Sequence, residues 1–279
     1  MTETATTAPG DRRLERAAAK QRKARRGAAI AVLSSVIVIG GLAALVLTSP
    51  GWPTVRETFF SWAEFRHSFP EVLSGFWLDI KIFMVVEAAV LVLALAIALI
   101  RVNGSSALFP VRLLGTVYVD VFRGIPTVLL VYLVGFGIPA LELEGLPTDP
   151  VVLGGIALTL SYSAYVSEVY RAGIRSVHKG QRDAGLAVGL TEAQTMRHVI
   201  LPQAIRRVGP PLLNDFVALQ KDVALISIIG PIEAFRAAQI IQGENFNYTP
   251  LIAAALLYLV ITVPLARIVD RLGGVGDVR

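Results

Sequence analysis

Long apolar stretches with few or no charges constrain this chain more than any other feature of its sequence. Residues 28–47 contain no charged side chain, and five further apolar stretches lie near residues 75–100, 113–139, 150–170, 208–230 and 250–267. About 20 residues of α-helix cross the roughly 30 Å hydrocarbon core of a bilayer. Transmembrane strands would instead show apolar and polar residues in alternation, because their side chains face lipid and lumen in turn. None of these stretches shows that alternation. The sequence therefore predicts an all-α polytopic membrane protein with about six transmembrane helices.

Composition supports this class and excludes several kinds of chemistry. Hydrophobic residues make up 54% of the chain and charged residues 17%, against about 25% charged in soluble domains. There is no cysteine, which excludes disulfides, thiolate metal sites and a cysteine nucleophile. The three histidines are widely spaced, and no phosphate-binding loop or hydrolase motif occurs. We therefore expect no enzyme, and no metal or other cofactor bound by this chain.

The basic residues set the expected orientation. With the N-terminus in the cytoplasm, 20 of the 26 Lys and Arg residues fall in inner segments, and Arg56, Arg66 and Arg236 fall outside. Short positively charged loops resist translocation, so both termini are predicted to be cytoplasmic.

The N-terminal part divides into three predicted segments. Residues 1–27 are polar and basic, which predicts a disordered cytoplasmic tail at an anionic membrane surface. Residues 28–48 are expected to form a retained transmembrane helix, because no cleavage site of a signal peptide follows. Residues 49–73 carry five aromatic side chains between Phe59 and Phe69, which fits either an extracytoplasmic interfacial helix or an amphipathic linker.

The longest inner segment, residues 171–207, has the pattern of ordered structure. Leu186, Leu190 and Ala193 recur at helical spacing, Asp183 suits the start of a helix, and Pro202 is expected to end one. This predicts an exposed pair of amphipathic helices on the cytoplasmic side, available to a partner.

Residues 180–202 resemble the EAA loop of the permease subunits of ABC importers. The likeness rests on Gly180, on Asp183-Ala184-Gly185, on Gly189 four residues further on, and on the ending Ile200-Leu201-Pro202. Asp183 stands where Glu is usual, and Gly185 stands where Ala is usual.

Other motifs narrow the resemblance to the polar amino acid branch, the histidine, glutamine and glutamate type of permease. They are Arg123-Gly124-Ile125-Pro126, Ser163-Ala164-Tyr165 with Glu168 and Arg171, Lys221-Asp222 with Ser227, and Arg236-Ala237-Ala238-Gln239. Ile125 and Val223 each stand where this branch commonly has Thr. The likeness covers about residues 70–272.

The resemblance implies a five-helix permease core over residues 74–272, with 28–48 as an additional helix and 273–279 as a cytoplasmic tail. In this family the EAA loop is a coupling helix that docks on a separate ATPase subunit, where ATP and Mg bind. The expected partners are thus ABC ATPase subunits, an extracytoplasmic solute-binding protein, and a second copy of the chain or a similar permease. By this resemblance the ATPase-coupling residues are Gly180, Asp183, Ala184, Gly185, Gly189, Ile200, Leu201 and Pro202. The implied function is import of polar amino acids across the plasma membrane by alternating access.

Charged residues inside the predicted spans are candidates for the substrate pathway, because charges at mid-bilayer are costly and face the protein interior. Glu87 could line a cavity or pair with another helix. Asp120 and Arg123 could pair with each other beside a bend at Pro126, or line the pathway.

Asp215 and Asp222 share one helix face, with Gln220 and Lys221 beside it. Two acids and a lysine would suit the ammonium and carboxylate groups of an amino acid, and an inter-helix ion network is the alternative. Glu168 and Arg171, at the inner end of their span, are expected to hold the EAA loop.

Two other functions remain open at this point. An ion-coupled secondary carrier would use the buried acids for protons or sodium, although no internal repeat is apparent. A non-transporting membrane scaffold or sensor would use the inner segment to recruit a soluble protein.

Overall fold

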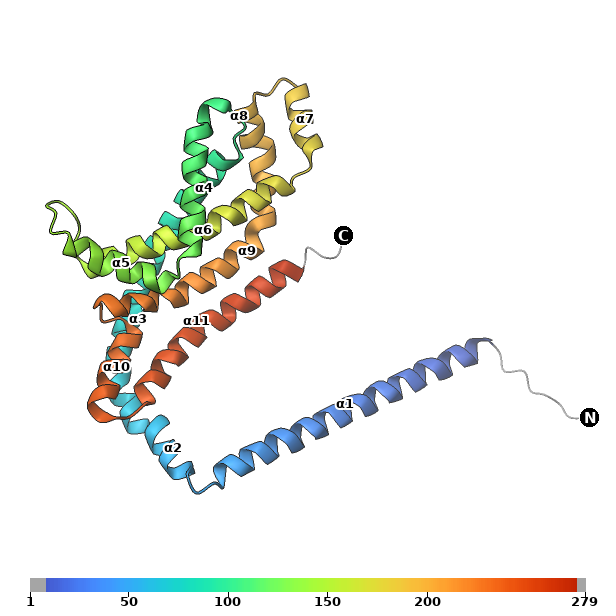
Figure 1. Ribbon diagram of the computed structural model, residues 1–279. Helices are drawn as coiled ribbons and strands as arrows, with labels where there is room; N and C mark the ends of the chain where they lie inside the picture. The colour runs from blue at the N-terminus through green and yellow to red at the C-terminus, as the bar shows by residue number, and fades with distance from the viewer. Residues whose placement is uncertain (1–8, 275–279) are drawn as a thin grey trace, which may run out of the picture. The chain divides into compact units, whose positions relative to one another are not determined.

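The computed structural model describes residues 9–274, with side-chain surroundings for residue 23 and residues 25–268, and it contains helices but no strands over that range (Figure 1). The chain divides into two compact units, one ending at Glu57 and the other beginning at Thr58.

The first unit consists of α1 (Pro9–Leu47) and most of α2 (Trp52–Phe59). The prediction of a disordered tail is wrong for residues 9–27, which belong to α1; residues 1–8 lie outside the described residues. The physical reason is that residues 11–26 are almost entirely Ala, Arg, Lys, Glu, Gln and Leu, which are strong helix formers. Within α1, Arg25–Leu47 is apolar and long enough to cross a membrane.

The second unit contains the remaining helices. They are α3 (Trp62–Val102), the 3₁₀ turn η1 (Ser106–Leu108), α4 (Phe109–Gly124), α5 (Thr127–Ala140), α6 (Pro150–Ser176), α7 (Lys179–Ala187), α8 (Glu192–Thr195), the π-helical segment η2 (Met196–Ile200), α9 (Leu201–Asp222), the 3₁₀ segment η3 (Val223–Ile229), α10 (Ala234–Asn245) and α11 (Thr249–Gly274).

Helix α3 begins before the predicted span. The Ser61 hydroxyl oxygen caps it by accepting a hydrogen bond from the Glu64 N–H at 3.4 Å, and Glu64 lies in the first turn, where the helix dipole favours an acid. Residues 62–73, predicted to belong to a linker or interfacial helix, are instead the first turns of the long helix α3.

The span expected near residues 113–139 is broken. Helices α4 and α5 meet at an angle of 103° at Ile125-Pro126, because Pro126 has no N–H for the helix and disfavours helical backbone at the residue before it. The sequence predicted a bend there. Four helices in the described range can each cross a membrane by length and apolarity, or up to six if each of two bent pairs counts as one span.

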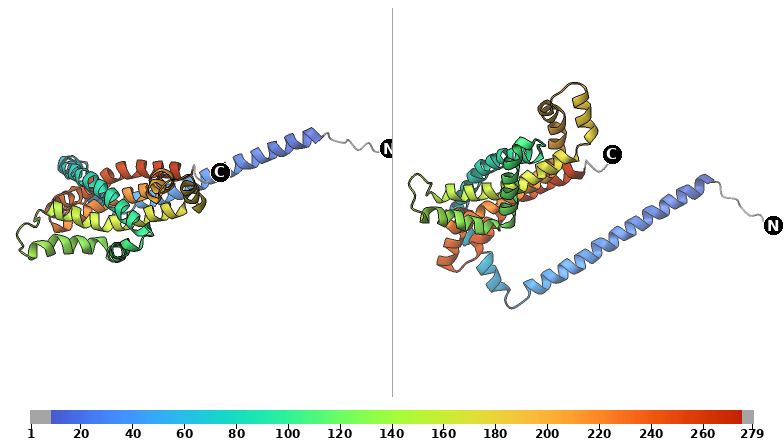
Figure 2. Two further views of the ribbon diagram at one scale, coloured as in Figure 1. Left: turned by 90° about the horizontal axis from the view of Figure 1, so that it is seen from above. Right: turned by 45° about the horizontal axis from the view of Figure 1, so that its top comes forward.

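The core of the second unit lies between α3 and α6, with α5, α9 and η3 packed around them. Val90, Leu153, Leu158, Leu219 and Ile226 are fully buried in this cluster. Helices α6, α9 and α11 run side by side in both views of Figure 2. Helices α7 and α8 project from one end of this bundle, so the segment that resembles the EAA loop lies outside the apolar core (Figure 1).

Candidate functional site

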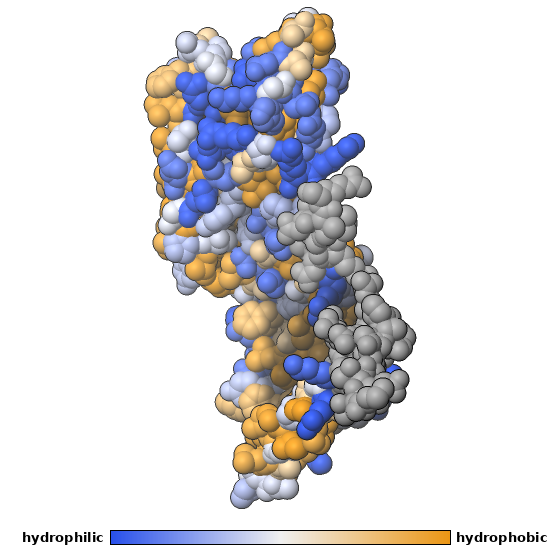
Figure 3. All heavy atoms as spheres, turned by 90° about the vertical axis from the view of Figure 1, so that its right-hand side faces the viewer, coloured by the Kyte–Doolittle hydropathy of each residue, from blue (hydrophilic) through white to orange (hydrophobic). Residues whose placement is uncertain are grey.

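The projecting segment is a helical hairpin built from residues 178–200, here called the α7–α8 hairpin. His178 caps α7 by accepting the Gly180 N–H on Nδ1 at 3.1 Å, and Thr191 and Gln194 form a reciprocal capping box at the start of α8. Arg182 of α7 donates to Glu192 of α8 at 2.7 Å. In the space-filling view, hydrophilic residues gather over the end of the unit that carries this hairpin (Figure 3).

The turn between the two arms depends on Gly189. Its φ of +88° lies in the left-handed region, which glycine adopts without the strain that a Cβ would cause. The Gly189 N–H donates to the carbonyl oxygen of Leu186 at 3.0 Å, which closes the end of α7. Gly189 is exposed, so its role is to reverse the chain at the tip of the hairpin.

Gly185 is the point where the two arms touch. A Cβ at this position would lie 2.8 Å from Thr195 Cγ2 and 2.9 Å from its Oγ1, and both residues are buried. Gly185, which was expected to be an ATPase-coupling residue, therefore packs against α8 of the same chain.

The other predicted residues of α7 are exposed. Asp183 and Ala184 lie on the outer surface of the helix, as does Gly180 in its first turn. Asp183 was predicted to lie at the start of the helix. It lies further along α7, because the helix begins directly after its cap, His178. These three residues form a surface that a partner can reach.

Ile200, Leu201 and Pro202 attach the hairpin to the bundle. Ile200 is buried with Ile174, Val177 and Ala204, and Leu201 packs against that cluster. Ile200 therefore faces this chain's own core and anchors the hairpin there.

Pro202 does not end a helix, contrary to the prediction. It occupies the first turn of α9, where a missing N–H costs little, and the preceding residues Met196–Ile200 form a π-helix in which the Leu201 N–H donates to the Met196 carbonyl. Helices α8 and α9 are therefore continuous in the chain through this π-helical segment.

Three charged residues join α3 and α6 near the hairpin. Glu168 of α6 forms ion pairs with Arg101 of α3 and with Arg171, one turn further along α6. Arg101 also donates to Thr116 Oγ1 of α4 at 3.4 Å. Glu168 and Arg171 were expected to hold the EAA loop; they instead hold together the ends of the helices beside it.

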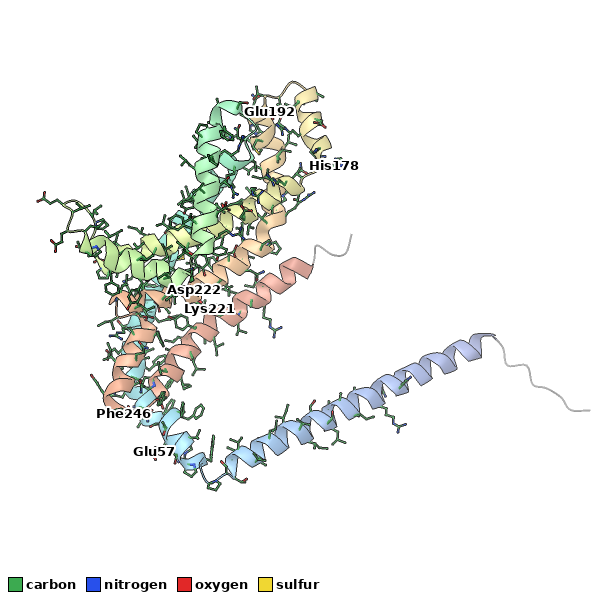
Figure 4. All side chains as sticks on the ribbon, in the orientation of Figure 1. Glu57, His178, Glu192, Lys221, Asp222 and Phe246 are labelled. Carbon is green, nitrogen blue, oxygen red and sulfur yellow. The ribbon has the colours of Figure 1, made fainter. Side chains whose placement is uncertain are left out.

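Most of the acids predicted for the pathway meet between α3, α6 and α9. Glu87 of α3 and Asp215 of α9 are half-buried and close enough for their carboxylates to repel each other. The Tyr162 hydroxyl of α6 donates to Asp222 Oδ2 at 2.8 Å and also lies within electrostatic range of Asp215. The predicted shared face of Asp215 and Asp222 thus points towards α6. Figure 4 shows Asp222 between the hairpin end, marked by His178 and Glu192, and the opposite end, marked by Phe246.

Gln220 and Lys221 do not join these acids. Gln220 is buried, and its Oε1 accepts a hydrogen bond from Thr262 of α11 at 3.1 Å. Lys221 is exposed, and no ion pair involves it in the part of the chain that the structure describes. The predicted grouping of two acids for an ammonium group with Lys221 for a carboxylate is therefore not assembled, because successive residues of a helix point about 100° apart.

Asp120 and Arg123 also remain apart. Both are exposed, and no ion pair joins them among residues 25–268. The Arg123 guanidinium instead lies 5.5 Å from the centre of the Tyr165 ring, and the Tyr165 hydroxyl donates to the Arg123 carbonyl at 3.2 Å. The predicted mutual pair is wrong, because Tyr165 of α6 provides the competing contact.

A second acidic cluster lies between α3, α10 and α11, and its members were not among the predicted site residues. Asp79 of α3 and Glu233 are each almost fully buried, and the Tyr258 hydroxyl of α11 lies 2.8 Å from Asp79 Oδ2 and 3.3 Å from Glu233 Oε2. Glu233 also accepts the N–H groups of Phe235 and Arg236, each at 2.7 Å, and so caps α10. Its position after the turn at Gly230-Pro231 was the available signal, and the cluster joins three helices.

The chain is similar to a known family of membrane transport proteins. Residues 102–273 match the family described as binding-protein-dependent transport system inner membrane component. The chain belongs to this family.

Relatives agree with that assignment. The permease is 36% identical over 200 residues to the probable glutamine ABC transporter permease protein GlnM of Bacillus subtilis. The aligned region covers 71% of this chain and 90% of that protein. It is 34% identical over 195 residues to the arginine transport system permease protein ArtQ of the same organism, and this alignment covers 70% of this chain and 87% of ArtQ. It is 35% identical over 214 residues to the glutamine transport system permease protein GlnP of Escherichia coli, with 76% of this chain and 96% of GlnP covered.

Solved structures agree as well. The permease matches a chain of an amino acid ABC transporter crystallised with histidines, with a TM-score of 0.67, 31% identity, and coverage of 75% and 96%. The inward-facing MetNI methionine ABC transporter shares the fold, with a TM-score of 0.59 at 18% identity and coverage of 72% and 94%. This chain is thus an ABC transporter permease and a multi-pass membrane protein. The family region spans α4 to α10 and nearly all of α11, and leaves out α1, α2 and all but the last residue of α3.

Proposed function

We propose that this permease imports polar amino acids, driven by a separate ATPase that docks on the α7–α8 hairpin. The substrate class is supported by the names of the relatives, which are glutamine and arginine permeases, and by the amino acid transporter of similar fold. ATP hydrolysis, with ATP and Mg, is assigned to the partner, and no cofactor to this chain.

The single observation that carries the proposal is that the hairpin has its own internal support. Its two arms are connected by the Gly185–Thr195 contact and the Arg182–Glu192 ion pair. The capping box at Thr191 fixes the start of α8. A rigid contact can transmit force, and reversing a two-state equilibrium nearly completely takes about 5.5 kcal/mol of differential binding. The exposed surface on which the ATPase docks consists of Gly180, Asp183, Ala184 and Gly189. This surface is held in position by Gly185, Ile200, Leu201 and Pro202.

The carboxylates of Glu87 and Asp215 are the part of the bundle interior best suited to a substrate ammonium group. They are half-buried, they come from two helices, and no ion pair neutralises either in the described range. Asp222 is held by Tyr162 beside them. Asp120, Arg123, Gln220 and Lys221 lie in other surroundings and are assigned no direct role in this site.

Orientation and partners complete the proposal. The hairpin lies on the cytoplasmic side with both termini, because 20 of the 26 Lys and Arg residues then face inward. A solute-binding protein delivers the amino acid from outside, and a second permease copy or a similar permease completes the pathway.

Vesicle reconstitution tests this function. The permease, its ATPase and its binding protein are placed in vesicles, and uptake of radiolabelled glutamine, arginine and histidine is measured with ATP inside. We expect uptake that requires ATP and is abolished when the ATPase is omitted. Uptake driven by a sodium or proton gradient without ATP would identify a secondary carrier, and no uptake under either condition would favour a scaffold; both would overturn the proposal.

A further inference from the structure

A basic cavity opens at the end of the bundle next to the hairpin, away from the acids of the interior. Its volume is about 270 Å³, and four arginines line it together with Phe109, Leu113 and Thr116: Arg101, Arg112, Arg171 and Arg175. They come from the end of α3, the start of α4 and the end of α6. Transport by the acidic interior makes no use of this cavity.

The charge of the cavity is strongly positive. Glu168 forms ion pairs with Arg101 and Arg171, which fixes two of the guanidinium groups and leaves an excess of three positive charges among these five residues. Arg112 is held in place by donating to the Asn103 carbonyl at 2.7 Å and by lying 5.5 Å from the centre of the Phe109 ring. Arg175 is exposed and makes no hydrogen bond or ion pair with any residue that the structure describes. Several guanidinium groups directed into one cavity favour a ligand with several negatively charged oxygens, such as a phosphate group.

The wall of the cavity continues into an apolar surface. Phe109, Leu113 and Val117 follow one another at intervals of four along α4, so they lie on one side of the helix, and about half of each side chain is exposed. A free phosphate ion would leave this apolar surface exposed, whereas the acyl chains of a lipid would cover it.

The position fits the same ligand. Arg101 lies in the last turn of α3, Arg175 in the last turn of α6, and Phe109 begins α4, so the cavity lies where membrane helices end. Basic pockets between transmembrane helices on the cytoplasmic side bind the headgroups of anionic lipids. We propose that this cavity is a binding site for an anionic phospholipid, with the headgroup phosphate among the four arginines and the acyl chains along Phe109, Leu113 and Val117.

Lipid titration of the detergent-solubilised transporter tests the site. Native mass spectrometry counts bound phosphatidylglycerol, phosphatidylcholine or inorganic phosphate on the wild-type complex. We expect phosphatidylglycerol to bind at least tenfold more tightly than phosphatidylcholine, and millimolar inorganic phosphate neither to bind at that affinity nor to displace it. If inorganic phosphate binds as tightly as the lipid, or if the two lipids bind equally, the proposal is wrong.

Matched arginine variants locate the binding. Arg175→Gln and Arg112→Gln are each expected to weaken phosphatidylglycerol binding about tenfold, because each removes a charge-assisted hydrogen bond to the phosphate group. Arg206→Gln is the control, because Arg206 is an exposed arginine of α9 that does not line the cavity. Arg175→Gln removes no hydrogen bond or ion pair to any residue that the structure describes. It therefore keeps the test valid if Arg112→Gln fails to fold. Equal binding by wild type and Arg175→Gln, or an equal loss in Arg206→Gln, would overturn the assignment.

Discussion

Gly185 and Thr195 lie in direct contact, although they belong to different arms of the hairpin and are both buried at its centre. The space that a Cβ would need at Gly185 is occupied by the Thr195 side chain at 2.8 Å. The shape of the hairpin is therefore determined within the chain, before any partner binds.

Replacing Gly185 by Val should force the two arms apart. Overpacking of this kind costs about 1–3 kcal/mol, and here the strain falls on the hairpin and not on the membrane core. We expect Gly185→Val to insert normally into membranes but to lose at least tenfold in ATP-driven uptake and in co-purification of the ATPase. Gly209→Ala, where a Cβ meets nothing within 4 Å, is the control. Wild-type uptake by Gly185→Val would show that the two arms need not touch.

Substitutions of Gly189 should act through backbone strain alone. Its Cβ direction is open, but its φ of +88° disfavours side chains, and most strongly β-branched ones. We expect ATPase co-purification to fall in the order Gly, Asn, Ala, Val, because Asn tolerates left-handed backbone best after Gly. Gly189→Trp is expected to insert but to lose co-purification. The docking assignment fails if Gly189→Val and Gly189→Trp both retain the ATPase.

Two glutamates at and beside the hairpin, Glu168 and Glu192, should differ in their contribution to stability. Glu168→Gln removes the partner of Arg101, whose side chain is only 9% exposed, and should lower the free energy of unfolding by about 1–3 kcal/mol. Glu192→Gln breaks the Arg182 pair, in which both side chains are more than half exposed, and should cost less than about 1 kcal/mol. Thermal unfolding in detergent measures both, and equal losses would contradict the stated role of burial.

Asp215→Asn should weaken transport by removing one of two adjacent carboxylates from the bundle interior. A charged hydrogen bond to an ammonium group contributes about 1.5–3 kcal/mol, so the KM for uptake should rise roughly tenfold or more, with permease levels in the membrane unchanged. Asp120→Asn, on the exposed surface of α4, is the matched control. An unchanged KM in Asp215→Asn, or the same increase in both variants, would exclude Asp215 from the substrate site.

Much of the fold could be predicted because it follows from local patterns. Apolar stretches located the spans, and Pro126 marked the bend of 103° because a proline removes a helix hydrogen bond wherever it lies. The spacing of Asp215 and Asp222 likewise predicted a common face. Each of these signals requires only a few neighbouring residues.

The mistaken predictions concern contacts between distant parts of the chain. Arg123 has a nearby acid in sequence, yet it lies over Tyr165, 42 residues away. The Asp79–Glu233–Tyr258 cluster joins residues from three helices, and Gly185 was assigned to a partner because Thr195 could not be placed. The sequence alone offers no register between helices, so residue types could be recognised while their partners could not.

The π-helical segment Met196–Ile200 bears on how length changes in this chain are tolerated. A π-helix holds one residue more than an α-helix over the same rise, with the Leu201 N–H bonded five residues back to Met196. Deleting one residue here would convert the segment to ordinary α-helix and leave α8 and α9 in their present orientation. A single-residue deletion elsewhere in either helix would rotate everything beyond it by about 100°.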